Sequence, residues 1–555
     1  MNKINILSAV LLLFPGTMNA QTATFHYFCY HGNDARFQEA IDKNREYFNP
    51  VIAGYHPDPS FCRAGDTYYL VNSSFSYFPG VPIYQSKDLI HWNQIGHVLD
   101  RASQDPLDHQ NVSGGIFAPA ISYNRHNKTF YMITTNVGKG SFFVKTKNPE
   151  KGWSDPIYLP QIDGIDPSFF FDRDGKGYIV HNAPVYGKTA YEGQRAIRIF
   201  RFDVNGDSII GKPKEIVRGG THVDKHPIWI EGPHLYRIGK FYYLMCAEGG
   251  TSTDHSEVIF RSANPMGPWE EDPGNPILTQ REGLDPNRLD KVTCTGHADL
   301  LQSKSGDWWA VFLGCRPYKD DLYNTGRETF LLPVTWEKGW PVILQKGKAV
   351  PTVCQMHSWQ WKTKAINAIP VTGNFTFRDD FHEQKLNPCW TFLRNPSSFY
   401  TLGQDGLKIS ALPVTIEQKK SPSALFYRQQ NTTFSTETEV VFSPENDKQF
   451  AGLCLFQNEK YNFVFGKTRI NNRLAILLTR TELMPVTIGT VFIDGKDSNV
   501  PVRLKIHGDG QYYDFYYSIG NGGWQVMARG VDASNLSTNK SGGFVGTMIG
   551  LYASK

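Results

Sequence analysis

Three carboxylates in the first two-thirds of the chain stand in similar motifs, each with a proline one or two residues later. Asp58 lies in HPDPS, Asp166 in GIDPS and Glu231 in EGPHL. Alone, an Asp-Pro-Ser sequence is more typical of a turn than of catalysis. Carboxylates gathered in one pocket repel each other, so one can keep its proton while another stays ionised. The three acids therefore predict general acid–base chemistry, provided that the fold brings them together.

A fivefold repeat supplies such a fold. Each repeat has an entry turn, an apolar strand, a polar turn and an aromatic-rich strand, which is typical of the two inner strands of a propeller blade. The repeats are HPDPSFCRAGDTYYLV from His56, FAPAISYNRHNKTFYMI from Phe117, IDPSFFFDRDGKGYIV from Ile165, IEGPHLYRIGKFYYLM from Ile230 and GHADLLQSKSGDWWAVF from Gly296. Their equivalent positions are taken as Asp58, Ala118, Asp166, Glu231 and Ala298. Equivalent positions of successive blades meet around the axis, so the pattern predicts that the three acids converge.

The whole chain is expected to be all-β, with a five-bladed β-propeller followed by a lectin-like, concanavalin A-like β-sandwich. Residues 49–343 form the propeller, 344–375 a linker and 376–555 the sandwich, where the repeat ends. Residues 1–20 have a lysine followed by a short apolar run, which is typical of a signal peptide and predicts export to the periplasm or the medium. Residues 21–48 are an N-terminal extension, and only the stretch Asn33 to Tyr47 has a helical pattern.

Composition argues against several classes of partner. The net charge is +4 with both signs interspersed and no basic block, so no nucleic-acid partner is expected. No later segment reaches the roughly 20 apolar residues of a membrane-spanning helix, so no membrane insertion is expected. The eight cysteines include no CxxC pair, which argues against a metal cluster, and most are expected to be buried thiols.

Seven motifs in order resemble glycoside hydrolase family 43, in the branch with a C-terminal β-sandwich that includes β-xylosidases. They are YHPDPS, SYFPGVPIYQSKDLIHW, SGGIFAPAISY, GIDPSFFFD, EGPHLY, TGHADL and GRETFLLPVTW. The resemblance runs from Asn49 to the end of the chain. It implies that Asp58 is the general base, Asp166 the carboxylate that orients and sets the pKa, and Glu231 the general acid. It also implies inversion at the anomeric carbon, which needs room for water between base and sugar.

The resemblance implies further site residues. Phe75 and Phe117 would line the pocket of the terminal sugar, Arg327 would bind sugar hydroxyls, and Phe544 of the sandwich would reach the rim. A histidine at the place of His297 in parts of the family helps to hold calcium or water, so a structural and a calcium-linked role both stay open. Hydrolysis itself requires no cofactor. Phe117, Ala120 and His56 depart from residues that are common in the family. The resemblance therefore does not determine which sugar the enzyme prefers.

The expected activity is release of terminal xylose from β-1,4-xylo-oligosaccharides of plant hemicellulose. The alternative is an α-L-arabinofuranosidase, because both activities occur on this scaffold. A retaining fructan hydrolase would want W-x-N-D-P-N and an E-C acid motif, which YHPDPS and EGPH do not match. A non-catalytic carbohydrate-binding protein would be expected to lose the acids, and all three are present.

Overall fold

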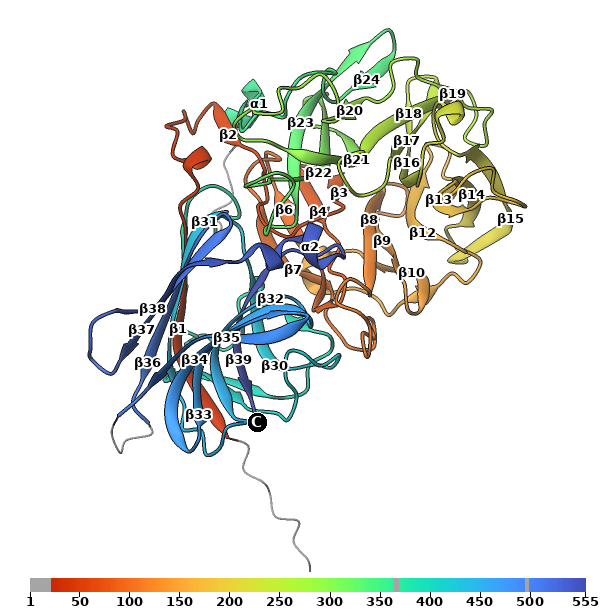
Figure 1. Cartoon of the computed structure of the whole chain (residues 1–555). Helices are drawn as coiled ribbons and strands as arrows, with labels where there is room; N and C mark the ends of the chain where they lie inside the picture. The colour runs from red at the N-terminus through yellow and green to blue at the C-terminus, as the bar shows by residue number, and fades with distance from the viewer. Residues whose placement is uncertain (1–20, 364–368, 495–498) are drawn as a thin grey trace, which may run out of the picture.

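Five antiparallel sheets, four of them with four strands and one with five, make up the first part of this computed structural model, which describes residues 21–363, 369–494 and 499–555 (Figure 1). Blade one holds β3 (Ser60–Ala64), β4 (Thr67–Val71), β6 (Gly80–Ser86) and β7 (Asn93–Leu99); blade two holds β8 (Ile116–Asn124), β9 (Thr129–Asn136), β10 (Gly140–Thr146) and β11 (Ile157–Tyr158); blade three holds β12 (Ile165–Phe171), β13 (Gly177–Pro184), β14 (Arg195–Asp203) and β15 (Ser208–Arg218). Blade four holds β16 (Glu231–Ile238), β17 (Phe241–Glu248), β18 (Ser256–Ser262) and β19 (Glu270–Glu271), with β20 (Leu278–Thr279) also on β18; blade five holds β21 (Thr293–Gln302), β22 (Trp308–Cys315), β23 (Arg327–Glu337) and β24 (Trp340–Val342).

The first strands of the five sheets form a closed ring. β3 neighbours β8, β8 neighbours β12, β12 neighbours β16, β16 neighbours β21, and β21 returns to β3. The five-bladed propeller expected from the repeat is therefore confirmed. Near the point of closure, Ile52 exchanges backbone hydrogen bonds with Thr329 of blade five, so the segment entering blade one is anchored to the last blade.

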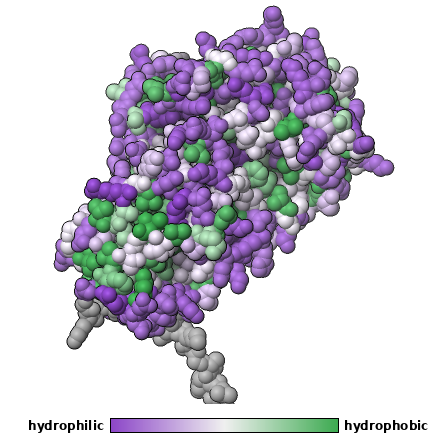
Figure 2. Space-filling view, viewed as in Figure 1, coloured by the Kyte–Doolittle hydropathy of each residue, from purple (hydrophilic) through white to green (hydrophobic). Residues whose placement is uncertain are grey.

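Two packed sheets form the sandwich, and one of them contains a strand from the other end of the chain. The first sheet has the order β28 (Tyr400–Gly403), β29 (Gly406–Ser410), β1 (Thr22–Gly32), β31 (Thr433–Val441), β36 (Val502–Asp509), β37 (Tyr512–Ile519) and β38 (Gln525–Asp532), with β26 (Thr376–Asp379) also on β1. The second has the order β30 (Ser423–Arg428), β39 (Met548–Ser554), β32 (Phe450–Asn458), β33 (Tyr461–Ile470), β34 (Arg473–Glu482) and β35 (Met484–Phe492). Much of the N-terminal extension is thus a central strand of the sandwich. Figure 2 shows hydrophobic residues gathered on this half of the molecule, where edge strand β35 exposes Met484 and Val486.

The helix expected from Asn33 to Tyr47 is wrong. This segment has one short 3-10 turn, η1 (Ala35–Phe37), and then β2 (Glu46–Phe48), which pairs with β25 (Val353–Gln355) of the linker. The other short elements are β5 (Tyr77–Phe78), β27 (Phe392–Leu393), η2 (Pro149–Lys151), η3 (Val223–Lys225), α1 (Ser358–Trp361), η4 (Ser534–Leu536) and α2 (Thr538–Ser541). Tertiary contacts determine the conformation of this segment in place of a helix. Phe37 is buried against Phe48, and Asp34 accepts a hydrogen bond from the Thr433 N–H of the sandwich.

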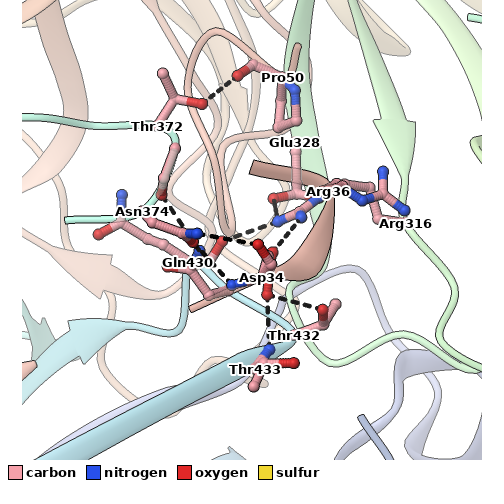
Figure 3. Close-up of polar contacts among 12 residues, drawn as sticks. Asp34, Arg36, Pro50, Arg316, Glu328, Thr372, Asn374, Gln430, Thr432 and Thr433 are labelled. Carbon is pink, nitrogen blue, oxygen red and sulfur yellow. Dashed lines mark hydrogen bonds and ion pairs between the residues drawn. The ribbon is translucent and has the colours of Figure 1, made fainter. Parts of the chain in front are cut away.

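A buried charged network joins the N-terminal segment, the propeller and the sandwich (Figure 3). The Arg316 guanidinium donates to both carboxylate oxygens of Glu328, at 2.6 and 2.8 Å, and to Asp34 at 2.6 Å. Asp34 in turn accepts hydrogen bonds from Thr432 and from the backbone of Thr433. Each carboxylate is paired and hydrogen-bonded, which is what makes a buried charge tolerable. The network holds the propeller and the sandwich together at Glu328, the residue next to Arg327.

Three sequence predictions concern features beyond this framework. The predicted signal peptide lies at residues 1–20, outside the described residues. Among the helices of the described residues, none has the length and hydropathy needed to cross a bilayer. All eight cysteines are free thiols, and six of them are buried.

Candidate active site

The entry turns of the inner strands share a left-handed backbone. Asp58, Ala118, Asp166, Gly232 and His297 have φ of 51°, 38°, 54°, 54° and 51°. Non-glycine residues adopt this region rarely, and such outliers cluster at functional sites. The equivalence inferred from sequence is correct in blades one to three and wrong by one residue in blades four and five. Gly232 and His297, not Glu231 and Ala298, take the repeat position, so Glu231 reaches the site from the residue before the turn.

All eight predicted site residues line one cavity of about 420 Å³. They are Asp58, Phe75, Phe117, Asp166, Glu231, His297, Arg327 and Phe544. The three acids are 6, 5 and 8 % exposed, whereas Ile228 and Trp229 of the same cavity are 41 and 39 % exposed. The cavity therefore leads from an exposed apolar rim to buried carboxylates.

Asp58 is held as a carboxylate by its neighbours. Burial alone would raise its pKa, but Arg327 and the Ser73 hydroxyl outweigh that effect, and the pKa lies below its usual value. Ser73 Oγ donates to Asp58 Oδ2 at 2.6 Å, and Arg327 Nη1 donates to Oδ1 at 3.2 Å. Ser73 is itself fixed, because its Oγ accepts the Ala118 N–H at 2.7 Å. An ionised carboxylate in this position is able to accept a proton.

The pKa values of Asp166 and Glu231 are raised, in contrast to that of Asp58. Burial, followed by the charge of Asp58, raises the pKa of Asp166 to about 7. Burial, followed by the charges of Asp166 and Asp58, raises the pKa of Glu231 well above its usual value. Environments that push the pKa values of neighbouring carboxylates apart assign acid and base. The raised pKa of Glu231 favours the protonated form that an acid needs, and the lowered pKa of Asp58 favours the ionised form that a base needs.

Three phenylalanines form an aromatic wall beside the acids. The ring of Phe75 meets that of Phe117 edge-on at 4.9 Å and stacks on that of Phe544 at 5.8 Å. Phe75 and Phe117 belong to the propeller, and Phe544 lies in the sandwich loop between α2 and β39. Aromatic faces of this kind pack well against the C–H faces of sugars. The sandwich thus contributes to the wall of the cavity.

Close backbone packing seats the Phe544 loop on the propeller. A Cβ on Gly546 would lie 2.6 Å from the Thr325 carbonyl oxygen, and a Cβ on Gly326 would lie 2.8 Å from the Gly546 Cα. Only glycines allow the two segments to come this near. The Phe544 N–H also donates to Ser113 Oγ at 2.9 Å. The loop is therefore fixed directly beside Arg327.

His297 lies below the acids, with Nδ1 3.8 Å from Asp58 Oδ1. Burial lowers its pKa to about 4, so the ring is neutral at neutral pH. Within the described parts of the chain, no three His, Cys, Asp or Glu side chains are grouped to hold a metal ion. The calcium-linked role of His297 stays a prediction.

Sequence reasoning missed several residues of the site. Ser73 and the rim residues Ile228 and Trp229 belong to no motif that was singled out, although Trp229 stands only two residues before Glu231. Of the three departures from the family pattern, only Phe117 lines the main cavity. His56 is buried and hydrogen-bonded to Ala53 and Tyr84, and Ala120 lies at a small hollow beneath the acids.

Two family models match nearly all of this architecture. The model for glycosyl hydrolases family 43 matches residues 47–341, and the model for the beta xylosidase C-terminal concanavalin A-like domain matches residues 378–555. The chain belongs to glycosyl hydrolases family 43. It is a glycosidase, with three buried carboxylates in the cavity of its propeller.

Related proteins align over almost the full length of this family 43 enzyme. A xylosidase/arabinosidase of Butyrivibrio fibrisolvens is 37 % identical, covering 91 % of this chain and 95 % of that protein. The non-reducing end alpha-L-arabinofuranosidase BoGH43B of Bacteroides ovatus is 35 % identical, covering 92 % of each. Among solved structures, a GH43_12 retrieved from capybara gut metagenome has a TM-score of 0.89 at 41 % identity, covering 97 % of this chain and all of that one. A xylan beta-1,4-xylosidase from Bacillus halodurans has a TM-score of 0.80 at 30 % identity, covering 92 and 96 %.

Proposed function

We propose that this enzyme releases terminal xylose from β-1,4-xylo-oligosaccharides of plant hemicellulose, with inversion at the anomeric carbon. The observation that carries the proposal is that Asp58, bonded to Arg327 and Ser73, shares one buried cavity with Glu231, whose pKa burial and neighbouring carboxylates raise. Hydrolysis of a glycosidic bond in one step needs an ionised base and a protonated acid on opposite sides of the sugar. A relative named xylan beta-1,4-xylosidase, similar in fold and sequence, supports xylose as the sugar.

The steps follow from the two protonation states. Asp58 accepts a proton from a water molecule as the water oxygen attacks the anomeric carbon. Glu231 gives its proton to the glycosidic oxygen as the bond from that oxygen to the anomeric carbon breaks. Burial, helped by the negative charge of Asp166, favours the proton on Glu231 until this moment. Glu231 ends ionised and Asp58 protonated, and exchange with solvent restores both.

An exo mode of action follows from the shape of the site. The acids are buried beneath a rim that is built partly by the sandwich, through Phe544. A polysaccharide that ran past the acids in both directions would need an open groove there. The cavity therefore favours a chain end, with one sugar unit beside the acids and the rest of the chain toward Ile228 and Trp229.

The second candidate is removal of α-L-arabinofuranosyl units. It is favoured by the arabinofuranosidase of Bacteroides ovatus and by the Butyrivibrio fibrisolvens relative, whose name includes both activities. Xylose and arabinose present similar hydroxyl patterns, and Arg327 with three phenylalanines is compatible with either.

Comparison of kcat/KM on aryl β-D-xylopyranoside and aryl α-L-arabinofuranoside separates the two candidates. We expect the xyloside to be preferred, and xylo-oligosaccharides labelled at the reducing end to shorten by one xylose at a time. Preference for the arabinoside would favour the second candidate. Lack of turnover on both would overturn the assignment to pentosides.

Export is part of the proposal and is supported by the sequence of residues 1–20 alone. A polymer-derived substrate is consistent with an enzyme in the periplasm or outside the cell. Fractionation of the source cells followed by N-terminal sequencing of the mature protein tests it, and we expect cleavage after Ala20. A cytoplasmic protein that keeps Met1 would contradict export.

A further inference from the structure

A second cavity lies between the propeller and the sandwich, behind the catalytic one. Its volume is about 220 Å³, and no Asp or Glu lines it. The propeller contributes His56, Tyr84 and Gln94 to its wall, and the sandwich contributes Arg428 and Gln430. The cavity thus contains a cationic side chain and several amides, and no carboxylate.

Arg428 is the unusual member of this wall. Its side chain is in a residue only 4 % exposed, and its Nε donates to the Tyr55 carbonyl oxygen at 2.9 Å. Among the residues that the structure describes, no other hydrogen bond and no ion pair involves its guanidinium. The two Nη groups are therefore left for the cavity. A buried cation without a counter-charge is costly, so such an arrangement calls for an anionic partner.

The other buried arginines of the described residues show the usual solution. Each is paired with at least one carboxylate: Arg198 with Asp163, Arg316 with Asp34 and Glu328, Arg327 with Asp58, and Arg394 with Glu459. Arg428 alone in this set has none. The fold pairs the guanidinium of each of the other four buried arginines with a carboxylate. The guanidinium of Arg428, which has no carboxylate partner among the described residues and lines a cavity, therefore points to an anionic partner from outside the chain.

We propose that this interface cavity binds a small oxyanion, with Arg428 as its charged ligand. The planar guanidinium can hold two oxygens of a carboxylate or a phosphate at once through its Nη groups. The amide of Gln94 lies in the same wall, where its Nε2 donates to the Pro388 carbonyl oxygen at 2.8 Å. Free inorganic phosphate and the carboxylate of a hexuronic acid share this chemistry, and the cavity volume does not distinguish them.

Tyr55 separates this cavity from the catalytic one. Its carbonyl oxygen holds Arg428, and its ring stacks on that of Phe75 at 6.1 Å. His56, the next residue, donates its backbone N–H to the Arg327 carbonyl oxygen. An anion bound to Arg428 would therefore lie behind the segment that carries Asp58, and it would not occupy the sugar site.

Binding to the full chain tests the proposal independently of the sugar preference. Isothermal titration with inorganic phosphate and with D-glucuronate, at constant ionic strength, should give a saturable signal for at least one of them, whereas neutral D-glucose tested alongside serves as the uncharged control. Arg428→Gln should weaken that binding roughly tenfold or more, because charge-assisted bidentate bonds are lost. Arg327→Gln is the matched control, since it removes the paired cation of the catalytic cavity, and it should leave the anion affinity unchanged.

Gln94→Glu provides a second variant that keeps Arg428. A carboxylate placed in the cavity wall should compete with the external anion and weaken its binding, even if Arg428→Gln fails to fold. Absence of saturable anion binding to the wild type would overturn the proposal. So would binding that survives both Arg428→Gln and Gln94→Glu, or binding that is lost only in Arg327→Gln.

Discussion

Asp166 Oδ2 accepts a hydrogen bond of 3.1 Å from the backbone N–H of Gly232, the residue that follows Glu231. The carboxylate that raises the pKa of the acid is thus tied to the same turn as the acid. Gly232 sits at the repeat position with φ of 54°, and a Cβ there would lie 3.0 Å from the His297 ring. Glu231, Asp166 and His297 therefore share one rigid junction of three blades.

Replacement of Asp166 by asparagine tests its effect on the acid. The amide oxygen can still accept the Gly232 N–H, but the negative charge is gone, so the pKa of Glu231 should fall. Glu231 works when protonated, and activity is lost as pH rises through its pKa. We expect the basic limb of the kcat/KM profile to move to lower pH. An unmoved basic limb would contradict the role of Asp166.

The same variant should be more stable at neutral pH. The folded-state pKa of Asp166, about 7, lies above its unfolded value, so this group costs stability progressively as pH rises from the unfolded pKa to the folded one. Asparagine removes that cost. Thermal unfolding should give a higher Tm for Asp166→Asn than for the wild type near pH 7, with the difference vanishing near pH 4. A lower Tm at neutral pH would argue against a strained, buried charge.

Glu231→Ala should impair the hydrolysis of natural glycosidic linkages far more than that of aryl glycosides with a good leaving group. General acid catalysis contributes about 10²–10⁴-fold, and a good aryl leaving group needs little protonation. We expect a loss of this size on xylobiose and a much smaller loss on a dinitrophenyl xyloside, measured as kcat. Equal losses on both substrates would mean that Glu231 is not the acid.

Phe544→Ala tests whether the sandwich is part of the active site. Loss of the ring opens the wall against Phe75 and Phe117 and misplaces the sugar, so kcat/KM on a small pentoside should fall roughly tenfold or more. Phe492→Ala, on the exposed edge strand β35, is the matched control and should leave kcat/KM unchanged. Equal activity of both variants would make the sandwich an accessory module.

Asp34→Ala tests the buried network between the domains. It leaves part of the Arg316 charge without its partner, and breaking a buried pair costs about 3–5 kcal/mol. Denaturant unfolding should show this loss in the free energy of unfolding. Asp66→Ala, which removes the exposed partner of Lys304, should change it little. Similar values for the two variants would show that the network does not hold the domains together.

The sequence predicted the site best where the same position of the repeat holds a carboxylate in more than one blade. Asp58 and Asp166 could be aligned because both precede proline at the entry of an inner strand, and blade geometry then brought them together. Glu231 was located by its motif although its repeat position was wrong by one. Glycine takes the left-handed position in blade four, and the acid moves to the preceding residue.

Long-range pairing could not be read from local patterns. Strand β1 pairs with β31, more than 400 residues away along the chain, and nothing in TATFHYFCYHG names that partner. The orienting role of Ser73 and the unpaired guanidinium of Arg428 depend likewise on contacts between distant segments. Such contacts are set by tertiary packing, which composition and spacing do not determine.

The configuration of the first sugar released tests the central claim that Asp58 activates water. Proton NMR during the first minutes of hydrolysis of an aryl β-D-xylopyranoside, before mutarotation, reports the anomer directly. We predict α-xylose as the first product, and Asp58→Asn should lose several orders of magnitude in kcat on every substrate, activated ones included. Azide could then replace the activated water and restore turnover. First release of β-xylose would contradict the account, because it would make Asp58 a nucleophile that forms a covalent intermediate.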